Sequence, residues 1–354
     1  MNGQTSNYLS HFRGAFLVTA LGLALGAWVG WAYTGTASGT MSFFFICLVL
    51  AALEISLSFD NAVVNANVLK DMDPVWQRRF LTWGILIAVF GMRILFPLII
   101  VAIAAKTGPI EAIKLAATSP ETYAHIMHEA HPDIAAFGGA FLLMVALTFF
   151  FDEEKDVHWI GALESRFGAC SHLTGIATVV CIALILLIAQ FYPGDAANRF
   201  IVSAIYGLAT FLVVDLIGDF LDSPRMGKEA GKAGLGAFLY LEVLDASFSF
   251  DGVVGAFALS HNLFIIAIGL GIGAMYVRSM TIMLVRNGVL AEFQFLEHGA
   301  FYAILVLAAI MFVQPLMHVP EVITGLIGVV LIGAALWSSL RARDKLKGDL
   351  GAGT

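Results

Sequence analysis

The chain has 354 residues, of which 59% are hydrophobic and 13% are charged, and its mean hydropathy is +0.87. Soluble domains are roughly half apolar and about a quarter charged, so this composition excludes a soluble globular protein. The formal net charge of −7 says little about orientation, which follows the placement of Lys and Arg rather than the net balance. We expect a polytopic membrane protein surrounded by membrane lipid, with no nucleic acid as a partner.

Ten apolar runs are long enough to cross a bilayer as helices, which takes about 17 to 25 residues each. Gly108-Pro109 and Pro193-Gly194 fall between runs, where these residue types end helices. The runs lie at 14–33, 41–69, 80–105, 134–151, 172–192, 200–221, 235–259, 263–285, 298–316 and 321–340. The sequence therefore predicts an all-α protein with about ten transmembrane helices.

Lys and Arg are distributed unequally between the two sides of the membrane. If the ten helices alternate, the side that holds both termini carries 14 of these residues in its loops, whereas the other side carries only Lys106, Lys114 and Arg199. Positive residues accumulate in cytoplasmic loops. We therefore expect the cell (inner) membrane, with both termini in the cytoplasm.

A nine-residue pattern occurs twice in the chain. It reads LEISLSFDN at 53–61 and LDASFSFDG at 244–252, which is 191 positions later. Each copy places two acids inside an apolar run, where an ionisable side chain is costly and by default indicates a functional site. These acids are Glu54 and Asp60 in the first copy and Asp245 and Asp251 in the second.

The positions of the two copies predict an inverted repeat. They lie in the second and seventh helices, so they cross the membrane in opposite directions, and substrate sites of such repeats lie near the membrane midplane. The halves are residues 1–192, with motif helix 41–69, and residues 193–354, with motif helix 235–259. Arg93 and Arg278 extend the match, since each follows a glycine by nine residues in the helix after the motif.

Ionisable residues inside the predicted spans carry excess negative charge. An unpaired charge at a helix centre costs roughly 2.5–3.5 kcal/mol, so protons or a metal ion must neutralise the excess. In the alternative, Asp60–Arg93 and Asp251–Arg278 pairs act only as interhelical staples. Asp215 and Asp219 either line an ion path or lie at the membrane boundary. The seven acids are Glu54, Asp60, Asp215, Asp219, Glu242, Asp245 and Asp251, against Arg93 and Arg278.

Spacing in the first copy predicts an interrupted helix. In a straight helix Glu54, Ser58 and Asn61 share one face while Asp60 points elsewhere. Serine hydroxyls in the Ser-Leu-Ser-Phe segment favour a bend, and unwound carbonyls would add oxygen ligands. We therefore expect Glu54 and Asp60 to converge across a break in this helix.

The residue types near the motif favour a hard divalent cation. Carboxylate, amide and hydroxyl oxygens suit manganese, calcium or magnesium, whereas zinc or copper favour Cys, Met or several His. Ser58, Ser249 and Glu242 are expected to support the site or to line the ion path. Outside the spans, His125, His128 and His131 have helical i, i+3 spacing. They either capture a metal ion weakly or, as we favour, belong to a solvated interfacial helix.

The motif resembles the signature of the TerC (tellurium-resistance) integral-membrane proteins. The resemblance rests on EISLSFDN at 54–61 and on SFD at 249–251, and it points to a longer branch beside TerC itself, within a superfamily similar to the LysE exporters. It implies manganese export. It also implies ion binding by Glu54, Asp60, Asn61, Asp245 and Asp251. Gly252 departs from the pattern, because the first copy has Asn61 at that place.

The function that we expect is secondary transport, namely export of divalent metal cations, manganese first and calcium second, coupled to protons. The chain has no Walker-type glycine loop, so we expect no enzyme activity and no permanently bound cofactor, the metal ion being the cargo. A homo-oligomer is compatible with the sequence. The alternatives are a metal-dependent intramembrane enzyme and a non-transporting membrane component of a metal or tellurite stress-resistance complex.

Overall fold

The structure is a computed structural model of the chain. It describes residues 10–84, 86–152, 155, 157–168, 170, 172–222, 234–286, 293–317 and 319–352. Within these ranges the side chains of residues 88, 218–222, 250, 251, 254, 258, 321, 322 and 344–352 are not described. The acids Asp219 and Asp251 therefore have a described backbone only.

All regular structure in the described part is helical. The α-helices are α2 (Arg13–Thr34), α3 (Ala37–Leu57), α4 (Phe59–Asp71), α5 (Pro74–Arg79), α6 (Phe96–Ala104), α7 (Pro109–Thr118), α8 (Pro120–Phe150), α9 (Gly161–Gly168), α10 (Ile176–Ala189), α11 (Asp195–Asp222), α12 (Leu235–Leu259), α13 (Leu263–Arg286), α15 (Leu296–Val313) and α16 (Glu321–Ala352). Two π-helical stretches, η1 (Phe80–Gly84) and η2 (Ile87–Leu95), lie between α5 and α6. The all-α fold class is thus confirmed for the residues described.

Eight helical segments of the described chain are long and apolar enough to cross a membrane. They are Arg13–Thr34, Ala37–Leu57, Pro74–Ala104, Pro120–Phe150, Asp195–Ile217, Leu263–Arg286, Leu296–Val313 and Ile323–Arg343. The other two expected spans are helical but fall outside this group, because α10 has only 14 residues and α12 contains Glu242, Asp245 and Asp251. The chain is therefore a multi-pass membrane protein by length and composition.

Two of the expected spans, those that contain the first motif and follow the histidine segment, differ from the sequence prediction in ways that matter for the candidate site. The expected helix 41–69 is divided into α3 and α4 at Ser58. The expected span 134–151 is the second half of α8, which begins at Pro120 and contains Pro132. The helix accommodates Pro132 in its interior, so the His125–His131 segment is helical and continuous with the span.

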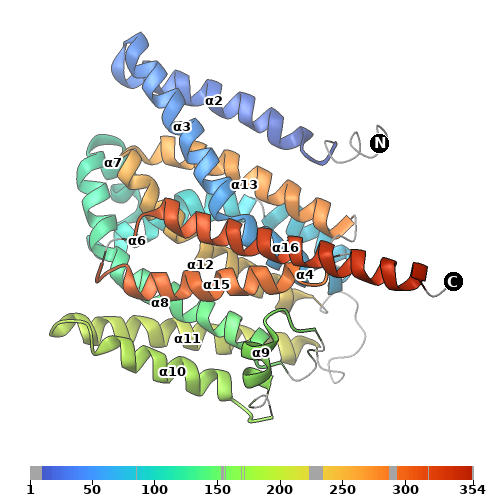
Figure 1. Cartoon of the computed structure of the whole chain (residues 1–354). Helices are drawn as coiled ribbons and strands as arrows, with labels where there is room; N and C mark the ends of the chain where they lie inside the picture. The colour runs from blue at the N-terminus through green and yellow to red at the C-terminus, as the bar shows by residue number, and fades with distance from the viewer. Residues whose placement is uncertain are drawn as a thin grey trace.

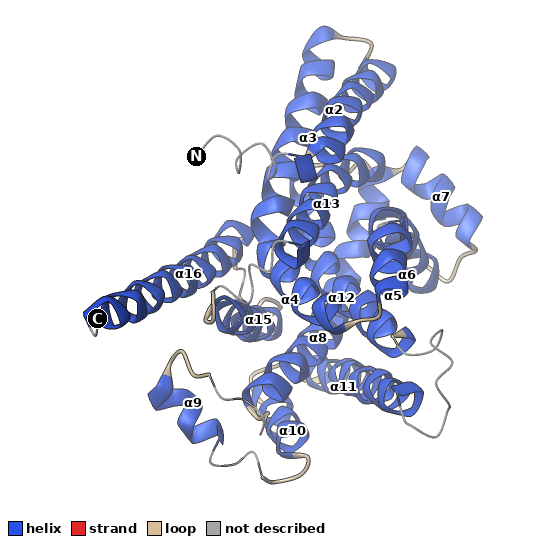
Figure 2. Cartoon of the chain, turned by 90° about the vertical axis from the view of Figure 1, so that its right-hand side faces the viewer, coloured by secondary structure: helices blue, strands red, loops and turns tan. Residues whose placement is uncertain are grey.

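The helices form a bundle with both ends of the chain on one side. The helix α2 begins and α16 ends at the right of Figure 1, which we call the terminal end of the bundle; α9 lies at the same end and α7 at the opposite end. Viewed along the bundle, α4, α12, α15 and α8 occupy the middle, surrounded by the remaining helices (Figure 2). The motif helices thus lie at the centre of the bundle.

Large apolar side chains cover the outside of the bundle. Phe16 (50% exposed), Leu21 (63%) and Trp28 (64%) lie on α2, and Leu216 (67%) and Val330 (65%) lie on α11 and α16. Soluble proteins seldom expose extended apolar surfaces. Lipid chains would cover these side chains in a membrane, so the exposed surface agrees with the bundle spanning a bilayer.

A buried carboxylate at the terminal end joins the loop after α8 to α15. Glu164 of α9 is 1% exposed. It accepts hydrogen bonds from Lys155 Nζ at 2.8 Å, Tyr302 Oη at 3.0 Å and the backbone N–H groups of Trp159 and Ile160 at 3.2 and 3.0 Å. Burial raises the pKa of Glu164, but the bonds from Lys155 and Ile160 outweigh it and lower the pKa from 4.5 to about 2.

Replacing Glu164 by Ala should destabilise the protein, because it leaves the Lys155 ammonium buried without its carboxylate. Removing one partner of a buried ion pair costs about 3–5 kcal/mol. The measurement is the thermal unfolding midpoint in detergent, with Glu121→Ala on the exposed start of α8 as the control. Since the pKa of Glu164 is lowered on folding, its stabilisation is complete above pH 4.5 and is lost as the pH falls through about 2. An unfolding midpoint equal to that of the control variant at pH 7 would contradict a stabilising role of the buried Glu164–Lys155 ion pair.

Candidate functional site

The first motif copy lies at the junction of two helices. Glu54 is in the last turn of α3, Asp60 and Asn61 are in the first turn of α4, and Ser58 between them has non-helical torsion angles (φ −105°, ψ 17°). The backbone N–H of Asn61 donates to Asp60 Oδ1 at 3.0 Å. N–H groups in the first turn of a helix lack intrahelical partners, so the break places an acid where such a donor is free. The predicted interruption is therefore present.

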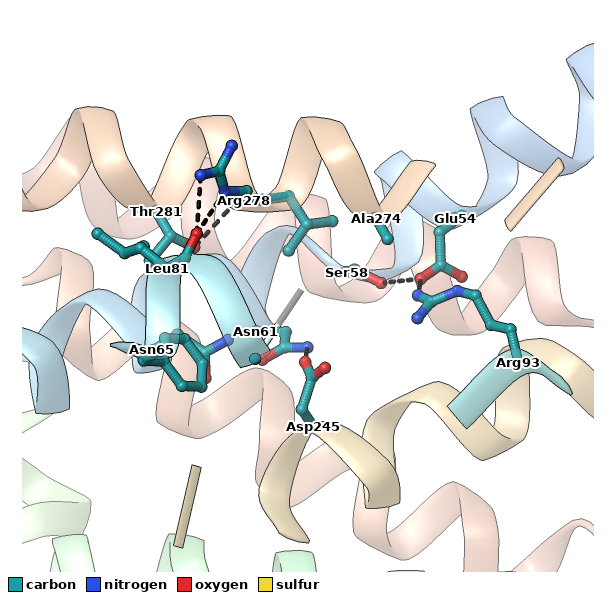
Figure 3. A pocket seen from close by; sticks show the side chains of 13 residues that line it. Glu54, Ser58, Asn61, Asn65, Leu81, Arg93, Asp245, Ala274, Arg278 and Thr281 are labelled. Carbon is teal, nitrogen blue, oxygen red and sulfur yellow. Dashed lines mark hydrogen bonds and ion pairs between the residues drawn. The ribbon is translucent and has the colours of Figure 1, made fainter. Parts of the chain in front are cut away.

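Glu54 is held by contacts from three helical segments. Its carboxylate forms a buried ion pair with Arg93 of η2 and accepts a hydrogen bond from Ser58 Oγ at 3.1 Å (Figure 3). A Cβ on Gly273 of α13 would lie 2.4 Å from Glu54 Cβ and Cγ, and one on Gly252 of α12 would lie 3.1 Å from Glu54 Oε2. Only glycine leaves room for Glu54 at position 273, because such short distances are not tolerated.

The second motif copy contacts the first through Asp245. Asn61 Nδ2 donates a hydrogen bond to Asp245 Oδ1 at 2.6 Å, and Figure 3 shows the two side chains directed at each other across the pocket. Unlike the first copy, the second lies in one continuous helix, α12. The repeated sequence therefore has different backbone conformations in the two copies.

Arg278 has a different partner from Arg93. Its Nε and Nη2 donate to the backbone carbonyl of Leu81 at 3.0 and 2.7 Å, and Leu81 belongs to the π-helical stretch η1. π-Helical turns occur mostly as single turns and frequently near functional sites. The expected pairing of an arginine with a motif acid is thus confirmed for Arg93, with Glu54 and not with Asp60 as its partner. The Asp251–Arg278 staple depends on a side chain that is not described.

Two small cavities meet at Glu54 and Ser58. The first, which we call the Asn61 cavity, is lined by Asn61, Asn65, Arg93, Asp245, Arg278 and Thr281 among others and offers about 40 Å³ to water. The second, the Asp60 cavity, offers about 30 Å³ and is lined by Asp60, Gly252 and apolar side chains of α15 and α16. Glu54 and Ser58 line both. Consecutive helical residues point about 100° apart, which explains why Asp60 and Asn61 face different cavities.

Three buried oxygen atoms around the Asn61 cavity have no hydrogen-bond partner among the described residues. They are Asn61 Oδ1, Asn65 Oδ1 and Glu242 Oε1. Asn61 and Asn65 line the cavity, and Glu242 Oε1 lies 2.9 Å from the position of a Cβ on Gly84, another lining residue. Most buried polar atoms are satisfied in native proteins. Three acceptors without a donor therefore indicate that a cation or water occupies this region.

Several predicted site residues lie elsewhere. Asp215 is exposed on α11 and is not among the residues that line either cavity, so its place on an ion path stays a prediction. Ser249 is 5% exposed but is not among the residues that line either cavity. The side chains of Asp219 and Asp251 lie outside those described.

No group of three His, Cys, Asp or Glu side chains in the described part converges closely enough to hold a metal ion. The predicted ligands Glu54, Asp60 and Asp245 are instead divided between the two cavities. His125 lies 3.7 Å from Glu129 on the exposed face of α8, in agreement with the solvated-helix interpretation of this segment.

The sequence analysis missed Asn65 and Thr281. Asn65 is 4% exposed and follows Asn61 by one helical turn, and Thr281 Oγ1 donates to the carbonyl of Ala62 at 3.4 Å. Both line the Asn61 cavity. An inventory of uncharged polar residues in the spans, at i, i+4 from the motif, would have found Asn65.

Comparison with known proteins assigns the chain to a family. A family model described as "Protein of unknown function (DUF475)" matches residues 59–346. The chain belongs to this family. The DUF475 match begins at the first residue of α4 and includes Asp60, Asn61, Arg93, Asp245 and Arg278, but it leaves Glu54 outside. No curated protein and no solved structure matches the chain.

Proposed function

We propose that this DUF475 protein is a secondary transporter that exports divalent metal cations, manganese first and calcium second, in exchange for protons. The observation that carries the proposal is the set of buried, unpartnered acceptors, Asn61 Oδ1, Asn65 Oδ1 and Glu242 Oε1, beside the Asn61 cavity. A cation in the Asn61 cavity would give Asn61 and Asn65, which line it, a partner, and Glu242 lies beside the lining residue Gly84. Substrate sites in transporters of inverted-repeat architecture lie at such interrupted central helices.

The charge balance of the site supports a cationic substrate. Asp60 accepts a hydrogen bond from a backbone N–H group and Asp245 accepts one from a side-chain amide, and both donors are neutral. Glu54 has Arg93, whereas Arg278 donates to a backbone carbonyl. Buried charges are costly unless they are paired. An excess of carboxylate around the cavities therefore favours binding of a metal ion or of protons.

The chemistry of the lining favours a hard cation. The described lining of the two cavities contains carboxylate, amide and hydroxyl oxygens but no Cys, His or Met side chain. Oxygen ligands suit manganese, calcium and magnesium, whereas zinc and copper favour nitrogen and sulfur ligands. The resemblance of the motif to TerC proteins favours manganese within this group.

Helix contacts support an inverted repeat of residues 1–192 and 193–354. The packing of α2 on α3 corresponds to that of α11 on α12, and the packing of α3 on α13 corresponds to that of α12 on η2. The packing of α4 on α15 likewise corresponds to that of α12 on α8. The packing of α8 on α10 corresponds to that of α15 on α16. Exchanging the two halves preserves these four packings, whereas the packing of α8 on α11 has no counterpart of comparable extent between α15 and α2.

The orientation follows from the loop charges. We place the protein in the cell (inner) membrane with both termini in the cytoplasm. The terminal end of the bundle in Figure 1 then faces the cytoplasm. Metal would then enter from that end and leave at the end that carries α7.

The test is metal flux through the purified protein in liposomes. Manganese outside and a metal-sensitive dye inside should give a protein-dependent signal, and calcium should compete with manganese at higher concentrations. Empty liposomes and liposomes with the protein inactivated by heat are the controls. Binding of manganese without any flux would favour the enzyme or the non-transporting component over a carrier.

A further inference from the structure

The two cavities extend toward opposite ends of the bundle. The Asn61 cavity reaches Asn65 in the middle of α4, one turn closer to the terminal end than Asn61, and Thr281 in the last turns of α13. The Asp60 cavity reaches Ile310 late in α15 and Thr324 at the start of α16. Because α15 runs away from the terminal end and α16 runs toward it (Figure 1), both residues lie in the opposite half. Glu54 and Ser58, which line both cavities, form the boundary between them.

This boundary is closed by charge and by close packing. The side chains of Glu54 and Arg93 are each 3% exposed, and Arg93 lines only the Asn61 cavity. The close approach of Gly273 to Glu54 leaves no space beside the Glu54 stem. A cation that moves between the cavities must therefore pass the Glu54 carboxylate, which is already bound to a cation.

We propose that the Glu54–Arg93 ion pair is the closed gate between the two cavities, and that the transported divalent cation opens it by replacing the Arg93 guanidinium on Glu54. This inference rests on the proposed export function. Arg93 is then a positioning residue, because it holds Glu54 until a competing cation arrives. The displaced guanidinium remains beside the Asn61 cavity, where the carboxylate of Asp245 and the amide oxygens of Asn61 and Asn65 offer acceptors.

The gate also explains selection by charge. A monovalent ion that replaces the guanidinium exchanges one positive charge for another, so the charge at Glu54 does not change. A divalent ion adds a charge at a site surrounded by further acids. Competition with a tethered cation therefore discriminates against sodium and potassium more strongly than an empty carboxylate would.

The first experiment measures manganese affinity of the purified full-length protein by calorimetry. In the Arg93→Met variant the competing cation is gone, so affinity should rise on the order of tenfold, as expected for coupled sites. The Arg278→Met variant removes the same charge from the same cavity without freeing a carboxylate, and its rise should be smaller. In the Glu54→Gln/Arg93→Met double variant the rise should disappear. An arginine that only supports the fold predicts unchanged or weaker binding in Arg93→Met, and that result would overturn the gate.

The second experiment measures transport in liposomes, and it covers the case in which Arg93→Met fails to fold. Replacing both partners of a buried ion pair is often nearly neutral for stability, so the Glu54→Gln/Arg93→Met variant should remain folded. Loss of the Glu54 carboxylate should lower its flux, but each manganese ion that it carries downhill should be accompanied by at least several-fold fewer protons than in wild type. Coupling equal to wild type would overturn the gate while leaving the transporter proposal intact. Absence of flux in wild type would instead remove the proposed function itself.

Discussion

Replacing Asp60 or Asp245 by Asn should abolish manganese flux while the protein still accumulates in the membrane. Asn keeps the shape of Asp and removes the charge, so no cavity forms. Each acid lines one of the two cavities and accepts a hydrogen bond from a neutral donor, so its charge is available to a cation. Changes one step removed from a metal ligand already cost roughly 10- to 100-fold in affinity, and we expect loss of a ligand itself to cost at least on the order of 100-fold. Flux is measured in liposomes at equal protein content.

Asp215→Asn is the matched control for these two variants. It removes the same charge from another apolar helix, but Asp215 is exposed and lies outside the cavities. Its flux should equal that of wild type. Equal flux in all three variants would show that the motif acids do not form the transport site. Asp251→Asn extends the series to the acid that the motif resemblance assigns to the second copy.

The sequence was sufficient to locate the centre of the molecule. Glu54, Asp60 and Asp245 were assigned to the site because charged side chains in apolar runs need a partner, and the structure places them at two adjoining cavities. The Ser-Leu-Ser-Phe segment predicted a break, and the break occurs at Ser58. Both features depend only on residues that are close together in the sequence, so a single sequence is enough to predict them.

The choice of partners could not be read from the sequence. Periodicity shows which residues share a face of a helix but not which neighbouring helix that face meets. Arg93 therefore was assigned to Asp60 in the staple alternative, whereas the packing of η2 brings it to Glu54. For the same reason the sequence left open whether Asp215 lines an ion path or lies at the membrane boundary, and the structure places its side chain exposed on α11.

Glu164 shows a second limit of sequence reading. Nothing in the local pattern of α9 distinguishes it from a surface acid, yet it is almost fully buried. Its partners are dispersed along the chain, from Lys155 to Tyr302. A site assembled from distant residues leaves no spacing signal, and only the folded chain reveals it.

A proton gradient that is acid outside should drive manganese out of the cell against its own gradient. An empty site with several buried carboxylates is costly unless they bind protons, because bare charges are poorly solvated in the bundle. A divalent ion that enters from the cytoplasm would displace these protons. Protons that return from the outside would then release the ion. Under the proposed inverted repeat, alternating exposure of the site to the two sides provides the two exchanges.

Inside-out vesicles, whose lumen corresponds to the outside of the cell, measure this coupling directly. An acidic lumen should accelerate manganese uptake, and the uptake should make the lumen more alkaline, as a pH-sensitive dye reports. Asp60→Asn and Asp245→Asn vesicles should show neither change, because both exchanges require the carboxylates. Uptake that proceeds equally with the pH gradient collapsed, and without proton movement, would exclude antiport. Since metal would then cross by itself, the two cavities would form the path of a uniporter or channel.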